Sequence, residues 1–171
     1  MENTNIETLI EVLSQKFGNA VQHHEMAYDM MVVEVNKAKL HEILQFLKEH
    51  PVYQFNFLTT MCGLHFPDAA PEKQLGIMYQ LHSFVNNLRI RIKSFFPDTG
   101  LVELPTVSDI WPTANWMERQ EFDFFGFRFL GHPDLRRILN VDDMQMFPMR
   151  KEYPLEDQTR EDKDDTMFGR K

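Results

Sequence analysis

The alternation of apolar and basic side chains at residues 88–93 is the feature that most constrains the fold. Leu88, Ile90 and Ile92 fall on one face of an extended chain, and the residues between them are two arginines and a lysine. A strand with this pattern belongs in a sheet that has one packed face and one face open to solvent. The chain must therefore supply other elements that cover the apolar face.

Two segments have the spacing of helices that could cover it. Apolar residues recur every three or four positions over residues 5–17 and again over 37–49. Gly18 is a natural end for the first helix, Asn3 or Asn5 could cap its start, and Pro51 lies just beyond the second.

The remaining apolar runs predict strands. Residues 21–35 are rich in β-formers and suggest two short strands with a break near Asp29, and residues 52–61, 75–85 and 87–96 suggest three more. Loops are expected at 66–73, which is acidic and contains proline, and at the turn 97–100.

This order of elements predicts an α+β fold, with a mostly antiparallel or mixed sheet, helices packed on one face and an extended C-terminal tail. We expect a single domain over residues 1–155. Residues 156–171 have too little apolar content to fold alone, so we expect a charged tail that is disordered or bound to a partner.

The composition excludes several classes of protein and site. The net charge of −8 argues against nucleic-acid binding over the whole surface, because phosphate requires a positive footprint. Cys62 is the only cysteine, so the chain alone cannot form a disulfide or an all-cysteine iron–sulfur or zinc site. No stretch approaches the roughly 20 apolar residues of a membrane helix, and no signal peptide opens the sequence. A cytosolic chain is expected, with a peripheral place on a membrane complex left open.

Residues 112–125 form the most unusual segment, because charges and aromatic rings are interleaved in it. We expect a helix from Pro112 or Thr113 to Phe125 that ends at Gly126. Arg119 and Asp123 are four residues apart and are expected to pair on the helix surface.

Either possible apolar stripe of this helix contains a glutamate, Glu118 or Glu121. An unpaired buried carboxylate is unfavourable by several kcal/mol, so the glutamate must either find a cation or stay at the edge of the apolar stripe. Arg136 and Arg137 are the nearest candidate cations. Arg128 and Arg119 are more distant candidates.

After Gly126 the sequence predicts a short strand and then a helical turn that begins at Pro133. Seven aromatic residues lie between Trp111 and Phe129. A small core is not expected to hide all of them, so some should face another protein.

Few residues suggest catalysis. Glu118 and Glu121 could act as an acid/base pair, and with His132 they could serve a free-standing metal or acid/base enzyme, but an ion-paired structural helix is the preferred interpretation. His23 and His24 are adjacent, so a strand would point them to opposite faces, which does not favour a shared metal site.

Two further patterns have structural explanations. The spacing from Gly126 to Gly131 matches a phosphate loop, but the lysine and serine or threonine that should follow are missing. The basic row of Arg89, Arg91 and Lys93 is either a binding strip or a solvated strand face, and the sequence does not separate the two.

The segment nevertheless resembles a known signature. The runs ERQEFDFFG, residues 118–126, and GHPDLRRIL, residues 131–139, closely resemble the signature of the C subunit of respiratory NADH-quinone oxidoreductase, complex I (the 30-kDa subunit of the mitochondrial enzyme). RKEYPL, residues 150–155, resembles the closing RKDYPL of that family, and the resemblance covers roughly residues 30–155. The sequence departs from the family pattern at Gln120, His65 and Phe147.

The resemblance implies a peripheral-arm subunit of a proton-translocating oxidoreductase that passes electrons from NADH through FMN and iron–sulfur clusters to quinone. Those cofactors would lie in partner subunits, with no catalytic, cofactor-binding or metal-binding residue in this chain. The partners implied are subunits B and D, and the location implied is the cytoplasmic face of the bacterial inner membrane. The alternative is the equivalent scaffold subunit of a membrane-bound hydrogenase or another complex-I-like dehydrogenase.

The resemblance also implies structural or partner-contact roles for a set of signature residues. These are Trp116, Glu118, Arg119, Glu121, Asp123, Phe125, Gly126, Gly131, His132, Pro133, Asp134, Leu135, Arg136, Arg137, Arg150, Lys151, Tyr153 and Pro154. Within this set, Arg136 and Arg137 are expected to face the D subunit.

Overall fold

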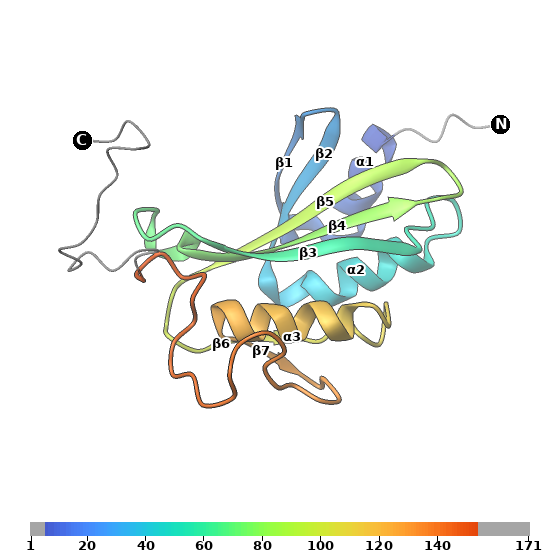
Figure 1. Ribbon diagram of the computed structural model, residues 1–171. Coiled ribbons are helices and arrows are strands. Elements are labelled where there is room, and N and C mark those ends of the chain that lie inside the picture. Colours follow the sequence, from blue (N-terminus) through green and yellow to red (C-terminus); the bar gives the residue numbers. More distant parts are fainter. Residues whose placement is uncertain (1–5, 154–171) are drawn as a thin grey trace, which may run out of the picture.

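A five-stranded mixed sheet organises the molecule (Figure 1). The structure is a computed structural model that describes residues 6–153. The strands, in chain order, are β1 (Val21–Ala27), β2 (Met30–Val35), β3 (Phe57–His65), β4 (Leu75–Ser83) and β5 (Leu88–Phe96). Their order across the sheet is β1-β2-β5-β4-β3, with β2 and β5 parallel and the other neighbours antiparallel. The predicted α+β fold is confirmed.

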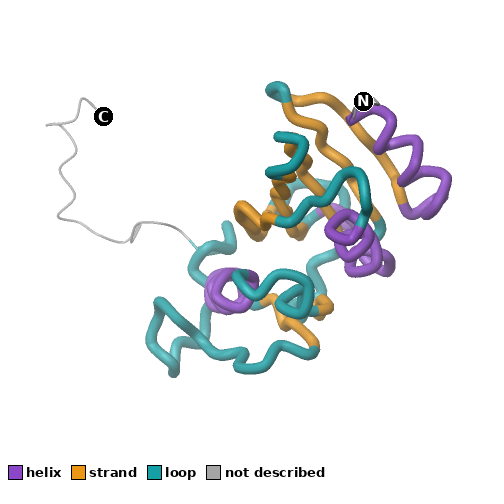
Figure 2. Tube along the Cα trace, turned by 90° about the vertical axis from the view of Figure 1, so that its right-hand side faces the viewer, coloured by secondary structure: helices purple, strands orange, loops and turns teal. Residues whose placement is uncertain are grey.

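Three α-helices lie on the same side of this sheet, which is clear when the sheet is viewed along its strands (Figure 2). They are α1 (Ile6–Phe17), α2 (Leu40–Glu49) and α3 (Ala114–Phe125), and short 3-10 turns occupy Gly18–Ala20, Lys37–Lys39 and Pro71–Lys73. The two N-terminal helices match the predicted segments, whereas the proposed caps Asn3 and Asn5 lie outside the described residues.

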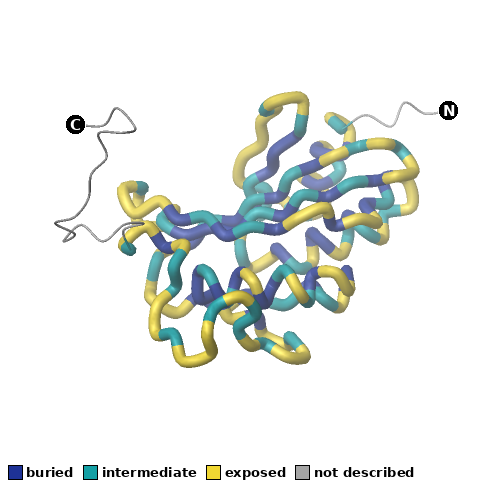
Figure 3. The backbone as a smooth tube through the Cα atoms, in the orientation of Figure 1, coloured by how far each residue is buried: buried dark blue, intermediate teal, exposed yellow. Residues whose placement is uncertain are grey.

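The core lies between the sheet and the helices, as the burial pattern along the backbone shows (Figure 3). Ile90 and Ile92 of β5 are fully buried in it, and Leu88 packs at its edge. The alternation therefore places the apolar face of β5 against the helices and its basic face on the open side of the sheet.

A second, two-stranded parallel sheet pairs β6 (Val102–Pro105) with β7 (Phe127–Leu130). The sequence predicted β7 but gave no sign of β6, which has only four residues and ends in proline. The two strands of this small sheet lie beneath α3 in the view of Figure 1.

The predicted strand over 52–61 is wrong at its start, since β3 begins only at Phe57 and continues to His65. The preceding residues form a turn in which Gln54 has a φ of 43° and the Phe55 N–H donates to the carbonyl of Leu47. This turn follows Pro51, so the chain leaves α2 and bends before it enters the sheet.

Residues 131–153 form a long C-terminal loop without helix or strand. The helical turn predicted from Pro133 is therefore wrong. The backbone N–H groups of Ile138, Leu139 and Asn140 donate to a side-chain carboxylate of α3 rather than to carbonyls of a helix. Among the described helices, none is long and apolar enough to span a bilayer.

Candidate functional site

Four charged side chains of α3 point into the protein rather than into solvent. Glu118, Glu121 and Asp123 are at most 1% exposed, and Arg119 is 8% exposed. The helix stops at Gly126, whose φ of 78° is the left-handed conformation that glycine adopts without strain. A helix buried with this many charges must satisfy each one locally.

Asp123 holds the C-terminal loop. Its Oδ2 accepts hydrogen bonds from the backbone N–H groups of Ile138, Leu139 and Asn140 at 2.8–3.2 Å. Its Oδ1 accepts from Arg137 Nη1 at 2.7 Å and from the amide of Asn140 at 3.0 Å. Burial alone would raise the pKa of this carboxyl, but the bonds from Asn140, Arg137 and Leu139 outweigh it and hold the pKa well below its usual range.

Two arginines complete this anchor from opposite sides. Arg119 donates from Nε and Nη2 to the carbonyls of Arg136 and Arg137, at 3.1 and 3.0 Å. Arg137 donates onward to the carbonyls of Met144 and Met146. The predicted surface pair between Arg119 and Asp123 is therefore wrong, because Asp123 pairs with Arg137 and Arg119 binds loop carbonyls.

A third arginine, Arg150, joins the end of the loop to the body of the protein. Its Nε donates to the carbonyl of Phe125 at 2.8 Å, and Nη2 donates to the carbonyl of Gly100 at 3.0 Å. Its Nη1 lies 3.3 Å from both carboxylate oxygens of Asp98, in the turn after β5. The C-terminal loop is thus attached at its start, middle and end by buried charged groups.

Glu118 and Glu121 find no arginine, contrary to the expectation for Arg136 and Arg137. Glu118 accepts from the Thr106 hydroxyl and the Val107 N–H, both at 2.6 Å. Glu121 accepts from the N–H of Gly63 on β3 at 2.5 Å. Each carboxyl therefore ties α3 to a neighbouring element by hydrogen bonds, and neither is paired with a lysine or arginine among the described residues.

The pKa values of these two carboxyls follow from that arrangement. Burial raises the pKa of Glu118 to about 7, although the bonds from Thr106 and Val107 oppose it. Burial likewise raises the pKa of Glu121 to about 7, against the bonds from Gly63 and Gln120. Both groups therefore change charge near neutral pH.

We expect the free energy of unfolding to fall as pH rises from about 4.5 to above 7. Below pH 4.5 both carboxyls are protonated in the folded and unfolded chain, and above 7 both are ionised, which the buried sites disfavour. Urea unfolding over this range checks the slope. In a double Glu118→Gln, Glu121→Gln variant, this decrease of the free energy of unfolding with pH should disappear. A decrease equal to that of the unmodified chain would contradict the attribution to these two carboxyls.

His65, Asp98 and Glu152 form the only group among residues 6–153 with the composition and spacing of a metal site, with ligand atoms within 4.8 Å of one another. His65 Nδ1 accepts the N–H of Lys151 at 2.9 Å, which leaves the proton of the neutral ring on Nε2, the atom that faces both carboxylates. A protonated Nε2 cannot bind a metal, and Arg150 already neutralises Asp98. The group fits an ionic contact better than a metal site.

His132 and the two glutamates do not form an open acid/base site. His132 Nε2 lies 3.0 Å from the carbonyl of Asn115 and 4.0 Å from Glu118, and its Nδ1 accepts the N–H of Asp134. The side chains of His132 and Glu118 are both fully buried. This arrangement favours the structural interpretation over the enzyme interpretation, because a substrate has no access to these groups.

The other predicted residues fall into three groups. Phe125 lies in the core, and Leu135 packs against it. A second group is exposed and consists of Gly131, Pro133, Asp134, Arg136 and Lys151, with Tyr153 partly exposed. Trp116 is also exposed, at 62%, and is the aromatic side chain of the 111–129 segment that faces solvent. Pro154 and the predicted tail at 156–171 lie outside the described residues.

Sequence reasoning missed several partners of the signature residues. Phe147 packs against Gly126 and lies between two guanidinium groups, with its ring centre 5.3 Å from Arg137 and 5.5 Å from Arg150. Asp98 and Asn140 were also missed. No local pattern marks Asp98 or Asn140, because each lies 17 or more positions along the chain from the residue that it binds.

Comparison with known proteins shows the family of the chain. Residues 33–159 match the family described as "Respiratory-chain NADH dehydrogenase, 30 Kd subunit". A C subunit of NADH-quinone oxidoreductase from Rhizobium etli, the form numbered 2, is 40% identical over 144 residues, which cover 84% of this chain and 74% of that protein. The C subunit of the same enzyme from Methylobacillus flagellatus is 35% identical over 156 residues, covering 89% and 79%.

Two solved structures share the fold. The trypsin-resistant fragment (1-134) of Nqo5 is 29% identical, with a TM-score of 0.62 over 74% of this chain and 98% of the fragment. A chain of the membrane-bound sulfane sulfur reductase, an archaeal respiratory membrane complex, has a TM-score of 0.71 over 87% of this chain and 85% of its own length, at 22% identity. The second likeness concerns the fold alone. The chain therefore belongs to the family of the 30-kDa subunit of respiratory-chain NADH dehydrogenase, whose bacterial relatives are named as the C subunit of NADH-quinone oxidoreductase.

Proposed function

We propose that the chain is a scaffold subunit in the peripheral arm of a proton-translocating NADH-quinone oxidoreductase, and that the C-terminal loop is its main docking surface. The observation that supports this is the combination of buried ionic anchors and outward apolar side chains in one loop. The buried charges of α3 are used to fix the position of the loop, which is the property that a scaffold needs.

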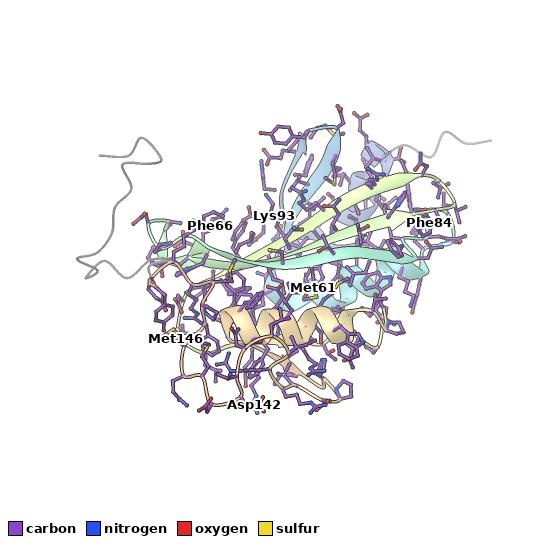
Figure 4. All side chains as sticks on the ribbon, in the orientation of Figure 1. Met61, Phe66, Phe84, Lys93, Asp142 and Met146 are labelled. Atoms are coloured by element: carbon purple, nitrogen blue, oxygen red, sulfur yellow. The ribbon has the colours of Figure 1, made fainter. Side chains whose placement is uncertain are left out.

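The exposed part of the loop carries four large apolar side chains among charged ones such as Asp142 and Asp143. Leu139 and Val141 are 63% and 64% exposed, and Met146 and Met149 are 45% and 52% exposed. Figure 4 shows Asp142 of this loop on the side of α3 that faces away from the sheet, and Met146 beside one end of α3. Exposed apolar side chains gathered on a rigid segment are typical of a protein–protein interface, in which methionine is enriched.

The role expected for Arg137 changes with the structure. Its guanidinium is directed inward to Asp123 and is 8% exposed, so it positions the loop rather than contacting a partner. Arg136 is 68% exposed beside Asp134 and is available to a partner. The contact with the D subunit that was expected of both arginines is therefore proposed for Arg136 and the apolar loop residues.

The remaining features of the proposal follow from the family. The partners are subunits B and D, which carry the terminal iron–sulfur cluster and the quinone cavity, while FMN and the other clusters lie elsewhere in the complex. This chain binds none of these cofactors itself. A membrane-associated, peripheral position agrees with the family, and we place the chain on the cytoplasmic face of the bacterial inner membrane.

Val141→Asp is expected to lower the yield of assembled complex at least tenfold, because burying a carboxylate in an apolar interface is unfavourable by more than about 1.4 kcal/mol. The yield is measured by purifying the complex through a tag on this chain and assaying NADH-quinone activity. Val85→Asp is the matched control, since Val85 is 63% exposed in the β4–β5 hairpin and outside the loop. Equal yields from both variants and the unmodified chain would reject the loop as a docking surface. Failure of the tagged chain to recover any oxidoreductase subunit would reject the function.

A further inference from the structure

The open face of the large sheet carries a row of cations on its central strand. Arg89, Arg91 and Lys93 alternate with the buried residues of β5, which lies third in the five-stranded order. All three therefore point to the side that carries no helix, and Figure 4 shows Lys93 on that side and Met61 on the opposite side, toward α3.

No ion pair within the described residues neutralises this row. Most other arginines and lysines of residues 6–153 contact a carboxylate, a carbonyl or an aromatic ring, whereas Arg89, Arg91 and Lys93 contact no carboxylate within 4.0 Å. Arg91 donates from Nη2 to the side-chain oxygen of Gln80 at 3.1 Å, but its Nε is buried and has no partner. The carboxylate of Glu34, on neighbouring β2, is already paired with Lys73 at 2.6 Å.

Both apolar and polar side chains flank the row. The polar neighbours are Glu34 beside Lys93, Gln80 beside Arg91 and His82 beside Arg89. The register places Met78 beside Lys93 and Val32 beside Arg91, and Phe95 follows Lys93 on the same face. These residues are half-buried or buried although none of the helices described within residues 6–153 covers them. Arginine, methionine and aromatic side chains are the types that protein interfaces favour, while a merely solvated strand face would not need the apolar members.

A hollow of about 290 Å³ opens beside Lys93, between the β1–β2 hairpin and the loop after β3. Its lining includes Lys93, Phe95, Phe66 and Lys73, together with Glu25 and with Glu34, which is paired with Lys73. Lys93 belongs both to the lining of this hollow and to the row on β5. The face thus offers both a groove and unpaired positive charge.

We propose that this basic face binds an acidic segment of a neighbouring subunit of the same complex. The inference rests on the proposed function, and it assigns a second docking surface on the side of the sheet opposite the helices. Charge complementarity identifies the occupant, because carboxylates would supply the partners that three unpaired cations and the buried Nε of Arg91 lack. The chain as a whole carries a net charge of −8, so the positive charge of this face differs in sign from the charge of the whole chain.

The test compares the reactivity of lysines in the free full-length chain and in the intact purified complex. Both are treated briefly with an acylating reagent, and modification is measured by mass spectrometry. We expect modification of Lys93 to fall about tenfold or more in the complex, because its ammonium group would be enclosed and held by carboxylates. Lys39, which is 49% exposed beside Glu42 on the helix side, is the reference and should react equally in both.

A carbodiimide treatment of the same complex then identifies the occupant. It joins an ammonium to a carboxylate in contact with it, so Lys93 should be linked to an aspartate or glutamate of another subunit. Equal reactivity of Lys93 in the free chain and the complex would overturn the inference. A link from Lys93 to residues 156–165 of this chain, with protection already present before assembly, would overturn it in favour of the chain's own acidic terminus. Neither result would affect the proposed function, which fails only if the chain is absent from the complex.

Discussion

Asp123→Asn is expected to lower the free energy of unfolding by about 3–5 kcal/mol, the range found when one partner of a buried ion pair is removed. The substitution keeps the size of the side chain but removes the charge opposite Arg137, whose side chain is 8% exposed. It also directs an amide N–H₂ toward backbone N–H groups of residues 138–140 that need an acceptor. The start of the C-terminal loop should then detach from α3.

Urea unfolding measures the loss of stability, and the rate of trypsin cleavage within the loop measures detachment. Asp134→Asn is the matched control, because Asp134 pairs with Arg136 at the surface and such pairs contribute at most about 1 kcal/mol. If Asp123→Asn changed stability and cleavage no more than the control does, the loop would not depend on this carboxylate, and the buried anchor would be wrongly identified.

Gly126→Ala is the second substitution with a large expected effect, a loss of about 2–5 kcal/mol from two separate causes. The first is the φ of 78°, which is unfavourable for any residue with a Cβ. The second is space, since a Cβ at this position would meet the ring of Phe147 within 2.5 Å. Displacing that ring would also disturb its contacts with Arg137 and Arg150.

Gly18→Ala separates the two causes, because Gly18 also has a positive φ, 51°, but nothing lies within 4 Å of its added Cβ. The control should therefore show only the backbone penalty of about 1–2 kcal/mol. The difference between the two variants, measured by urea unfolding, reports the clash with Phe147. A difference near zero would mean that Phe147 moves aside freely and does not secure the junction of α3 and the loop.

The alternation of β5 and the apolar spacing of the first two helices predicted those elements correctly because each pattern is local. A strand repeats every two residues and a helix about every 3.6, so burial of one face is visible within a short window. The end of α3 was predictable for the same reason, since Gly126 marks a left-handed cap without reference to any distant residue.

The charged anchors could not be predicted in this way. Helical spacing suggested that Asp123 pairs with Arg119 on the same helix, but the two residues satisfy different parts of a loop that follows 14–18 positions later. The helical turn predicted at Pro133 is absent for a related reason. The backbone N–H groups of residues 138–140 donate to the carboxylate of Asp123 instead of to the carbonyls of a helical turn. The sequence predicted that one of Glu118 and Glu121 lies in or beside the apolar seam, whereas both are buried. Their hydrogen bonds to Val107 and Gly63 depend on the packing of α3.

The hydrogen bond from Gly63 to Glu121 has a consequence for how the free subunit behaves before assembly. Gly63 lies on β3, an outer strand of the large sheet, and an outer strand can recruit a second chain and start aggregation. Glu121 occupies an N–H that such a chain would need, and α3 packs along the same strand. The opposite outer strand, β1, carries the consecutive ionisable residues His23, His24 and Glu25. Such residues on an outer strand discourage pairing between the strands of two free copies of the subunit.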